Sequence, residues 1–128
     1  MAMNKVPTLI LGLGGIGCQI AAEISDKLSD EDRKYVGVVG MDTNVNDLKK
    51  LKEHGVKSIQ TSDQRLVKEY LELHPEYIKW FPINKFTVNR GMVNGAGQIR
   101  AISRLAGLAT QERGSFQVLD EEIRRILR

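Results

Sequence analysis

Apolar residues occur along the chain in blocks of two kinds. Continuous runs at 6–13, 35–41 and 56–60 are typical of strands buried in a parallel sheet. Between and after these runs, apolar residues recur every third or fourth position, as they do on one face of a helix. Strands that alternate with helices through short links predict right-handed crossovers. The expected fold class is α/β, a three-layer, Rossmann-like, doubly wound parallel sheet.

The spacing also predicts which residues the helices bury. The first helix is expected to carry one apolar stripe, formed by Ile16, Ile20, Ile24 and Leu28. A short second helix is expected to bury Leu48 and Leu51 and to end at His54-Gly55.

Three later segments are also expected to be helical. They are 65–73, 98–109 with Ile99, Ile102, Leu105 and Ala109 on one face, and a last helix with the stripe Phe116, Leu119, Ile123 and Ile126. Tyr77, Trp80 and Phe81 are expected to form a hydrophobic anchor between the first two of these helices.

Composition narrows the class of protein. With 128 residues, 41% hydrophobic and 27% charged, the chain is expected to be one soluble, cytoplasmic domain. A net charge of +3 without a dense run of Lys and Arg predicts no nucleic-acid partner. No apolar segment approaches the roughly 20 residues of a membrane span, so no membrane partner is expected. Cys18 is the single cysteine and only two histidines are present, so neither a disulfide nor a metal site is predicted.

The stretch Gly12-Leu13-Gly14-Gly15-Ile16-Gly17-Cys18-Gln19-Ile20 is the first candidate site. Glycines between a strand and a helix let backbone N–H groups approach a phosphate, and the amino end of the helix attracts its charge. Asp42-Thr43-Asn44 follows the second strand, and the carboxyl ends of parallel strands meet at one edge of the sheet. Nucleotide phosphates are therefore expected here, but this pattern alone does not identify the nucleotide.

A second glycine-rich segment, Arg90 to Gly97, leads directly into a helix. Two glycine-rich helix starts in one chain can hold two parts of one polyphosphate. A plain dinucleotide-binding fold does not need the second.

Three motifs in order resemble the tubulin/FtsZ superfamily of GTPases. Gly12–Ile20 looks like the first nucleotide loop, and Met41–Leu48 resembles the Asn-Thr-Asp-x-Gln-x-Leu segment of FtsZ. Gly95-Ala96-Gly97 and the helix after it resemble the FtsZ Gly-Ala-Gly loop, while Gln98-Ile99-Arg100 is closer to a bacterial tubulin-like family. At 42 and 44, Asp and Asn are exchanged relative to FtsZ, which leaves their individual roles open.

The resemblance implies GTP or GDP with Mg²⁺ as the ligand. It places Gly14, Gly15 and Gly17 of the Gly12 turn against the phosphates. It places Gln19 at the guanine or ribose, and Asp42, Thr43 and Asn44 near the phosphate and magnesium. Ala96 and Gly97, after Gly95, would approach the γ-phosphate.

The resemblance also implies that residues 1–128 are the amino-terminal part of a GTPase domain. The family's Gly-Gly-Gly-Thr-Gly phosphate loop and its acidic loop for the attacking water are not among these residues, so no catalytic residue is assigned. In the family, hydrolysis is coupled to self-association. The fragment itself is expected to bind nucleotide weakly, to hydrolyse little GTP, and to dimerise or exchange strands through an exposed sheet edge.

Other interpretations remain open at this stage. An ATP-dependent adenylating enzyme shares the glycine turn, although the second Asp and the Arg of that class are missing here. An NAD(P)-binding fragment and a non-enzymatic scaffold are further alternatives. Arg100 and Arg104 share one helix face, which is either solvated or in contact with a subunit or phosphate.

Overall fold

The computed structural model describes residues 5–61, 65–84, 87, 89–91 and 100–128. Three parallel strands form its sheet in the order β1 (Thr8–Leu13), β2 (Val36–Asp42) and β3 (Lys57–Gln60). The helices are α1 (Gly14–Lys27), α2 (Val45–Glu53), α3 (Val67–Leu73), α5 (Arg100–Glu112) and α6 (Gln117–Ile126), with 3-10 turns η1 (Asp32–Lys34) and η2 (Pro75–Lys79).

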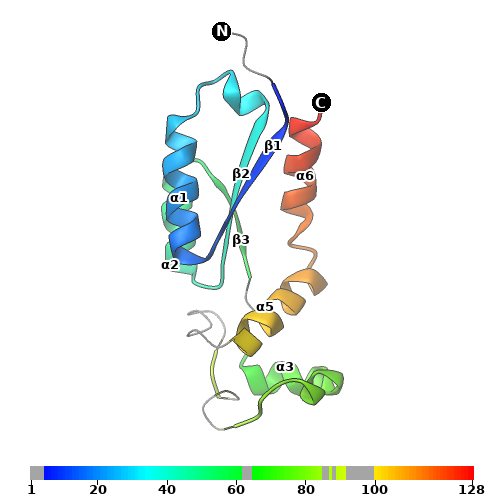
Figure 1. Cartoon of the computed structure of the whole chain (residues 1–128). Helices are drawn as coiled ribbons and strands as arrows, with labels where there is room; N and C mark the ends of the chain where they lie inside the picture. Colours follow the sequence, from blue (N-terminus) through cyan, green and yellow to red (C-terminus); the bar gives the residue numbers. More distant parts are fainter. Residues whose placement is uncertain (1–4, 62–64, 85–86, 88, 92–99) are drawn as a thin grey trace.

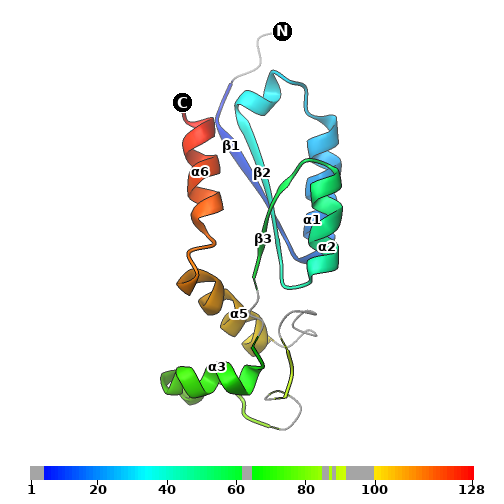
Figure 2. The same cartoon turned by 180° about the vertical axis from the view of Figure 1, so that it is seen from behind.

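The sheet lies between two layers of helices. Helices α1 and α2 cover one face and α6 covers the other, while α3 and α5 lie beyond the carboxyl ends of the strands (Figures 1 and 2). The expected three-layer, Rossmann-like α/β arrangement is confirmed. None of the described helices is both long and apolar enough to cross a membrane.

The face that α1 turns to the sheet differs from the predicted one. Ile16 and Ile20 are 77% and 52% exposed, and the buried side chains are the small ones of Cys18, Ala21 and Ala22. At Gly12 the helix backbone comes so close to β1 that only small side chains fit between them. The predicted stripe is therefore only partly buried: Leu28 at its end packs against the core, while Ile16 and Ile20 at its start are exposed. Four-residue spacing does not say which side of a helix meets the sheet.

Helix α2 follows the prediction. Leu48 and Leu51 are buried, and Leu51 covers Gly40 of β2, where a Cβ would overlap its side chain. The helix ends at His54-Gly55, with Gly55 in the left-handed region at φ +70°.

A second core lies beyond the carboxyl ends of the strands. It joins α3 and the segment after it to α5, through Val67, Tyr70, Leu71, Phe81, Ile102, Leu105, Ala106 and Ala109. Tyr77 and Trp80 pack against this cluster, which confirms the predicted aromatic anchor. We call α3, η2 and the segment up to Gly91 the helical lobe.

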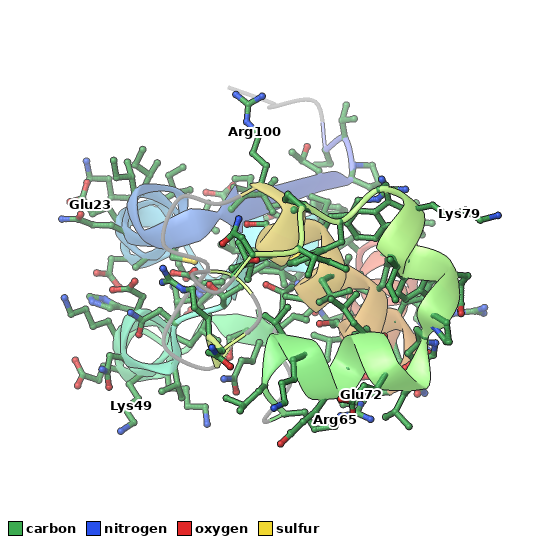
Figure 3. All side chains as sticks on the ribbon, turned by 90° about the horizontal axis from the view of Figure 1, so that it is seen from below. Glu23, Lys49, Arg65, Glu72, Lys79 and Arg100 are labelled. Carbon is green, nitrogen blue, oxygen red and sulfur yellow. The ribbon has the colours of Figure 1, made fainter. Side chains whose placement is uncertain are left out.

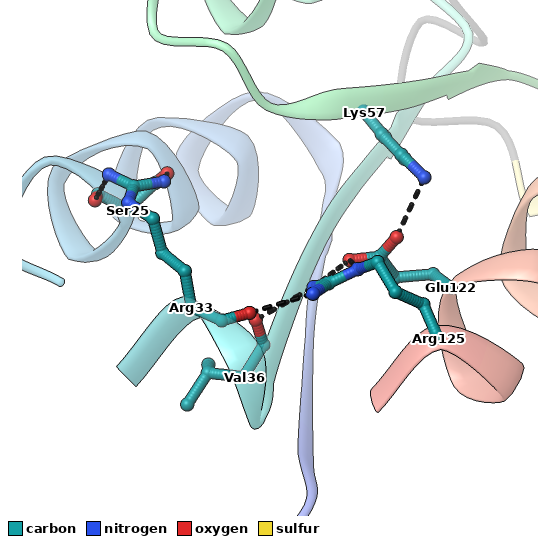
Figure 4. Close-up of polar contacts among 6 residues, drawn as sticks. All are labelled: Ser25, Arg33, Val36, Lys57, Glu122 and Arg125. Carbon is teal, nitrogen blue, oxygen red and sulfur yellow. Dashed lines mark hydrogen bonds and ion pairs between the residues drawn. The ribbon is translucent and has the colours of Figure 1, made fainter. Parts of the chain in front are cut away.

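Helix α6 is held on the sheet by a buried carboxylate (Figure 4). Glu122 is only 4% exposed and fits over Gly37 of β2, where a Cβ would lie 2.8 Å from its Cγ. Its Oε1 accepts a hydrogen bond from Arg125 Nε at 3.0 Å, and Oε2 forms an ion pair with Lys57 Nζ at 2.8 Å. Arg125 also donates to the carbonyl oxygens of Arg33 and Val36, at 2.7 and 3.1 Å.

The predicted stripe of α6 is therefore only partly the buried face. Ile126 is buried as expected, but Ile123 is 39% exposed and the charged Glu122 takes the central position. Apolar periodicity cannot reveal a buried carboxylate, because its partners are charged residues, Arg125 of α6 and Lys57 of β3.

Burial alone would raise the pKa of Glu122, yet hydrogen bonds and charges from Arg125 and Lys57 outweigh it and lower that pKa. A depressed carboxyl pKa stabilises the fold above the unfolded value of about 4.3. This stabilisation is lost as the pH falls through the folded value.

We expect Glu122→Gln to lower the free energy of unfolding at pH 7 by about 1–2 kcal/mol, because both cations lose their carboxylate but stay half-exposed. The difference from wild type should shrink as the pH falls below about 4, since protonation then removes the same charge. Urea unfolding at several pH values measures this. The neighbouring exposed Glu121→Gln serves as control, and an equal loss in that variant would contradict the assignment.

Candidate functional site

The amino end of α1 opens at the carboxyl edge of the sheet. Strand β1 ends at Leu13, which still has an extended backbone, and Gly14 turns into the helix at φ +76°. The first N–H groups of any helix lack intrahelical acceptors. No side chain caps α1, and its first turn carries no acidic residue. No residue of this turn itself therefore occupies the positive end of α1, as in an anion-binding helix start.

The glycines of the turn from β1 into α1 are needed for different physical reasons. A Cβ on Gly12 would overlap the carbonyl oxygen of Gly17, and a Cβ on Gly17 would lie 3.2 Å from the carbonyl carbon of Gly12. These two glycines let α1 pack on β1. Gly14 instead has a left-handed backbone with nothing within 4 Å of its missing Cβ. It is the turn residue that leaves the helix start open.

Asp42-Thr43-Asn44 forms the turn from β2 into α2, directly beside this helix start. Asp42 Oδ1 accepts hydrogen bonds from the backbone N–H groups of Thr43 and Asn44, at 2.7 and 3.3 Å. Asn44 Oδ1 accepts from Asn46 N at 2.9 Å and so caps α2. Two of the three predicted residues thus help to build the turn itself.

A second carboxylate, Asp47, joins Asp42 over Gly15. Their Oδ2 atoms lie 3.2 Å (Asp47) and 4.0 Å (Asp42) from the position that a Cβ of Gly15 would take. Asp42 Oδ2 is buried and has no hydrogen-bond partner among the described residues. Burial raises the pKa of Asp42, and Asp47 adds to this against the opposing backbone hydrogen bonds. Sequence reasoning missed Asp47, although it lies in the same Asp- and Asn-rich segment.

Gln19 lies on a groove between α1 and α2. The groove has a volume of about 560 Å³ and begins at Gly15 and Asp47 beside the helix start, with Gln19, Lys50 and His54 further along. His54 Nδ1 pairs with Asp26 Oδ2 at 2.7 Å and joins the carboxyl ends of the two helices. The structure therefore brings Gln19 to the side of α1 that faces α2 and Asp47.

Cys18 is packed under the turn, as expected for a small core residue. It is 2% exposed, with its Sγ atom 3.7 Å from Gly12 O and 3.6 Å from Met41 O. Burial raises the pKa of the thiol, and the charges of Asp42 and Asp47 raise it further. A thiol that is buried and protonated does not act as a nucleophile.

The third predicted segment, Gly95-Ala96-Gly97, lies outside the described residues. Its described neighbours are Gly91, which pairs with Leu66, and Arg100, where α5 begins. Within the described part of the chain, no group of three or more His, Cys, Asp or Glu side chains could hold a metal ion.

The family can now be assigned. A family model described as tubulin-like matches residues 9–128, from the second residue of β1 to Arg128. The chain belongs to the tubulin-like family. No curated protein and no solved structure gives a significant match. The resemblance seen in the sequence is thereby confirmed at the level of the family and of the α/β fold.

Substitution by alanine should lower the stability of the fold by different amounts at the two kinds of glycine. We expect Gly12→Ala to destabilise the fold by about 3 kcal/mol, because its Cβ meets backbone that cannot move aside. Gly14→Ala should cost only about 1 kcal/mol, the strain of a left-handed alanine in open space. Thermal unfolding of both variants measures the difference. Equal losses would show that the contact between Gly12 and Gly17 does not limit the packing of α1.

Proposed function

We propose that this chain forms part of a domain that binds a guanine nucleotide at the carboxyl edge of its sheet. The proposal rests on one observation. The uncapped start of α1 at Gly14 lies beside the Asp42 turn, and the chain belongs to the tubulin-like family. An open helix start at the edge of a parallel sheet is the usual position of nucleotide phosphates.

The described residues of the predicted site have different roles in this proposal. The backbone N–H groups of Gly14 and Gly15 face the phosphates, and Gln19 offers its amide to the guanine or ribose. Thr43 and Asn44 border the phosphates from the neighbouring strand. Gly12 and Gly17 act indirectly, because their contact holds α1 where its first turn meets the ligand.

A divalent cation fits beside the phosphates. The buried, unpartnered Oδ2 atom of Asp42 and the Oδ2 atom of Asp47 converge over Gly15. Two carboxylates next to a polyphosphate repel it unless a cation or a proton lies between them. Carboxylate oxygens are ligands that Mg²⁺ prefers, and Mg²⁺ bound there would neutralise phosphate charge.

We extend the proposal to hydrolysis and self-association in the longer protein. Among the described strands, β1 pairs only with β2, so its other edge has unpaired backbone groups. Leu11 and Leu13 of β1 are 38% and 62% exposed. An apolar strand with a free edge is a template for pairing with another strand, which is consistent with a dimer or filament.

The first test is nucleotide competition. We expect GTP and GDP to displace a fluorescent guanosine diphosphate from the chain at concentrations about tenfold below those of ATP or NAD. Gln19→Ala should reduce this preference severalfold, because an amide contact to the base is lost. Gln117→Ala, an exposed glutamine on the opposite layer, serves as control. A preference for ATP would favour the adenylating enzymes, and one for NAD the dehydrogenases.

The second test is turnover. We expect the 128-residue chain to release little or no phosphate from GTP, even with Mg²⁺ present, since no residue in it is assigned to activate water. A sensitive phosphate-release assay measures this, and Asp42→Ala shows whether any residual release comes from a contaminant. Sustained release that Asp42→Ala abolishes would place catalytic residues within this chain.

A further inference from the structure

A second cavity lies at the amino end of the sheet, away from the helical lobe. Val36 and Val38 of β2 and Lys57 of β3 line it, together with side chains of α1, η1 and α6. Its volume is about 240 Å³, the room that about eight water molecules take in the liquid. It shares no lining residue with the groove beside Gln19, so it is separate from the candidate nucleotide site.

Part of the cavity wall is apolar. Val38 and Val56 are 9% and 5% exposed, and Leu28 packs against the same cluster. A hydrocarbon group placed against these side chains would be removed from water, which is favourable. The cavity can therefore hold the methylene groups of a ligand as well as its polar groups.

The charged side chains that border the cavity carry a surplus of positive charge. Three of its lining residues are cations, Arg33, Lys57 and Arg125. Glu122 is the one acidic residue among the described residues that line it, which leaves a surplus of two positive charges. Exposed charges elsewhere, such as that of Arg100, project outward into solvent instead (Figure 3). A cavity lined mainly by one sign of charge attracts ions of the opposite sign.

The two surplus charges point in different directions (Figure 4). Arg33 points toward α1, where its Nη2 donates to Ser25 O at 2.6 Å, and its guanidinium pairs with no carboxylate of the described residues. Lys57 Nζ lies 2.8 Å from Glu122 Oε2, on a carboxylate that also pairs with Arg125. Because an ammonium has three N–H donors and a guanidinium has five, both Lys57 and Arg33 can bind a further carboxylate.

We propose that this cavity binds a short dicarboxylate, with one carboxylate at Arg33 and the other at Lys57. The two negative charges match the surplus of two positive charges, and the methylene groups between them lie against the valines of the wall. A compact anion with one charge would neutralise only one of the two cations. Because the ligand joins η1 to β3, its binding stabilises the folded chain. The proposal does not depend on the nucleotide site.

The first measurement compares ligands by the shifts of amide resonances in the 128-residue chain. Succinate should shift the amides of Val38 and Val56 with a dissociation constant of about 1 mM. Butyrate, which has as many carbon atoms but one carboxylate, should bind about three- to tenfold more weakly, and the neutral succinamide should cause no shift. Equal affinities for succinate and butyrate, or shifts at Gly14 and Gly15 of the helix start without shifts at the valines, would overturn the proposal.

The second measurement assigns the two ends of the ligand. Arg33→Gln and Lys57→Gln should each lower the affinity for succinate to that of butyrate, because each leaves one carboxylate without its cation. Lys34→Gln is the matched control and should bind as wild type, since Lys34 is exposed next to Arg33 but does not line the cavity. Arg33→Lys keeps the charge and should bind succinate within about threefold of wild type, which decides the question if Arg33→Gln does not fold. An equal loss in Lys34→Gln, or wild-type affinity in Arg33→Gln, would contradict binding in the cavity.

Discussion

The contact between Gly12 of β1 and Gly17 of α1 determines how the rest of the molecule can be built. Because neither residue has a side chain, the helix backbone rests almost directly on the strand. This brings Cys18, Ala21 and Ala22 against the sheet, Ala21 at Gly12 of β1 and Cys18 at Gly40 of β2, and leaves no room for larger residues. It also fixes the first turn of α1 at the carboxyl edge, level with the turn at Asp42. The geometry of the candidate site is thus a consequence of close packing inside the fold.

The two faces of the sheet are held by different physical forces. On the α1 and α2 side, Leu51 fills the space over Gly40 and packing is apolar. On the α6 side, Gly37 makes room for the charged Glu122, whose partners reach it from α6 itself and from β3. Each face therefore has its own glycine in the middle strand: Gly40 leaves room for a leucine methyl group and Gly37 for a carboxylate. The second arrangement depends on pH and the first does not.

The sequence predicted the strands, their parallel direction and the helices, because these depend on local spacing and on short links. Leu48, Leu51 and the aromatic anchor at Trp80 were predicted correctly for the same reason. The buried face of α1 was predicted only at Leu28, since the close approach at Gly12 favours small residues over large apolar ones at the start of the helix. Glu122, Asp47 and the contact of Arg104 with Trp80 were not predicted, because each depends on at least one partner that is distant in the sequence, such as Lys57 for Glu122 and Gly15 for Asp47. Long-range pairs of polar groups have no periodicity to reveal them.

The structure shows what the exchange of Asp and Asn at positions 42 and 44, relative to FtsZ, changes physically. Asn44 caps α2, and aspartate would serve equally well at that position, so the exchange does not affect the fold there. Position 42 is different, because one oxygen of its side chain is buried without a partner beside Asp47 and Gly15. An asparagine at 42 would place a neutral amide in this pocket, whereas the aspartate adds a second carboxyl group. The exchange therefore moves one negative charge from a solvated helix cap to the wall of the proposed phosphate site. There it opposes the phosphates unless a cation or a proton accompanies them.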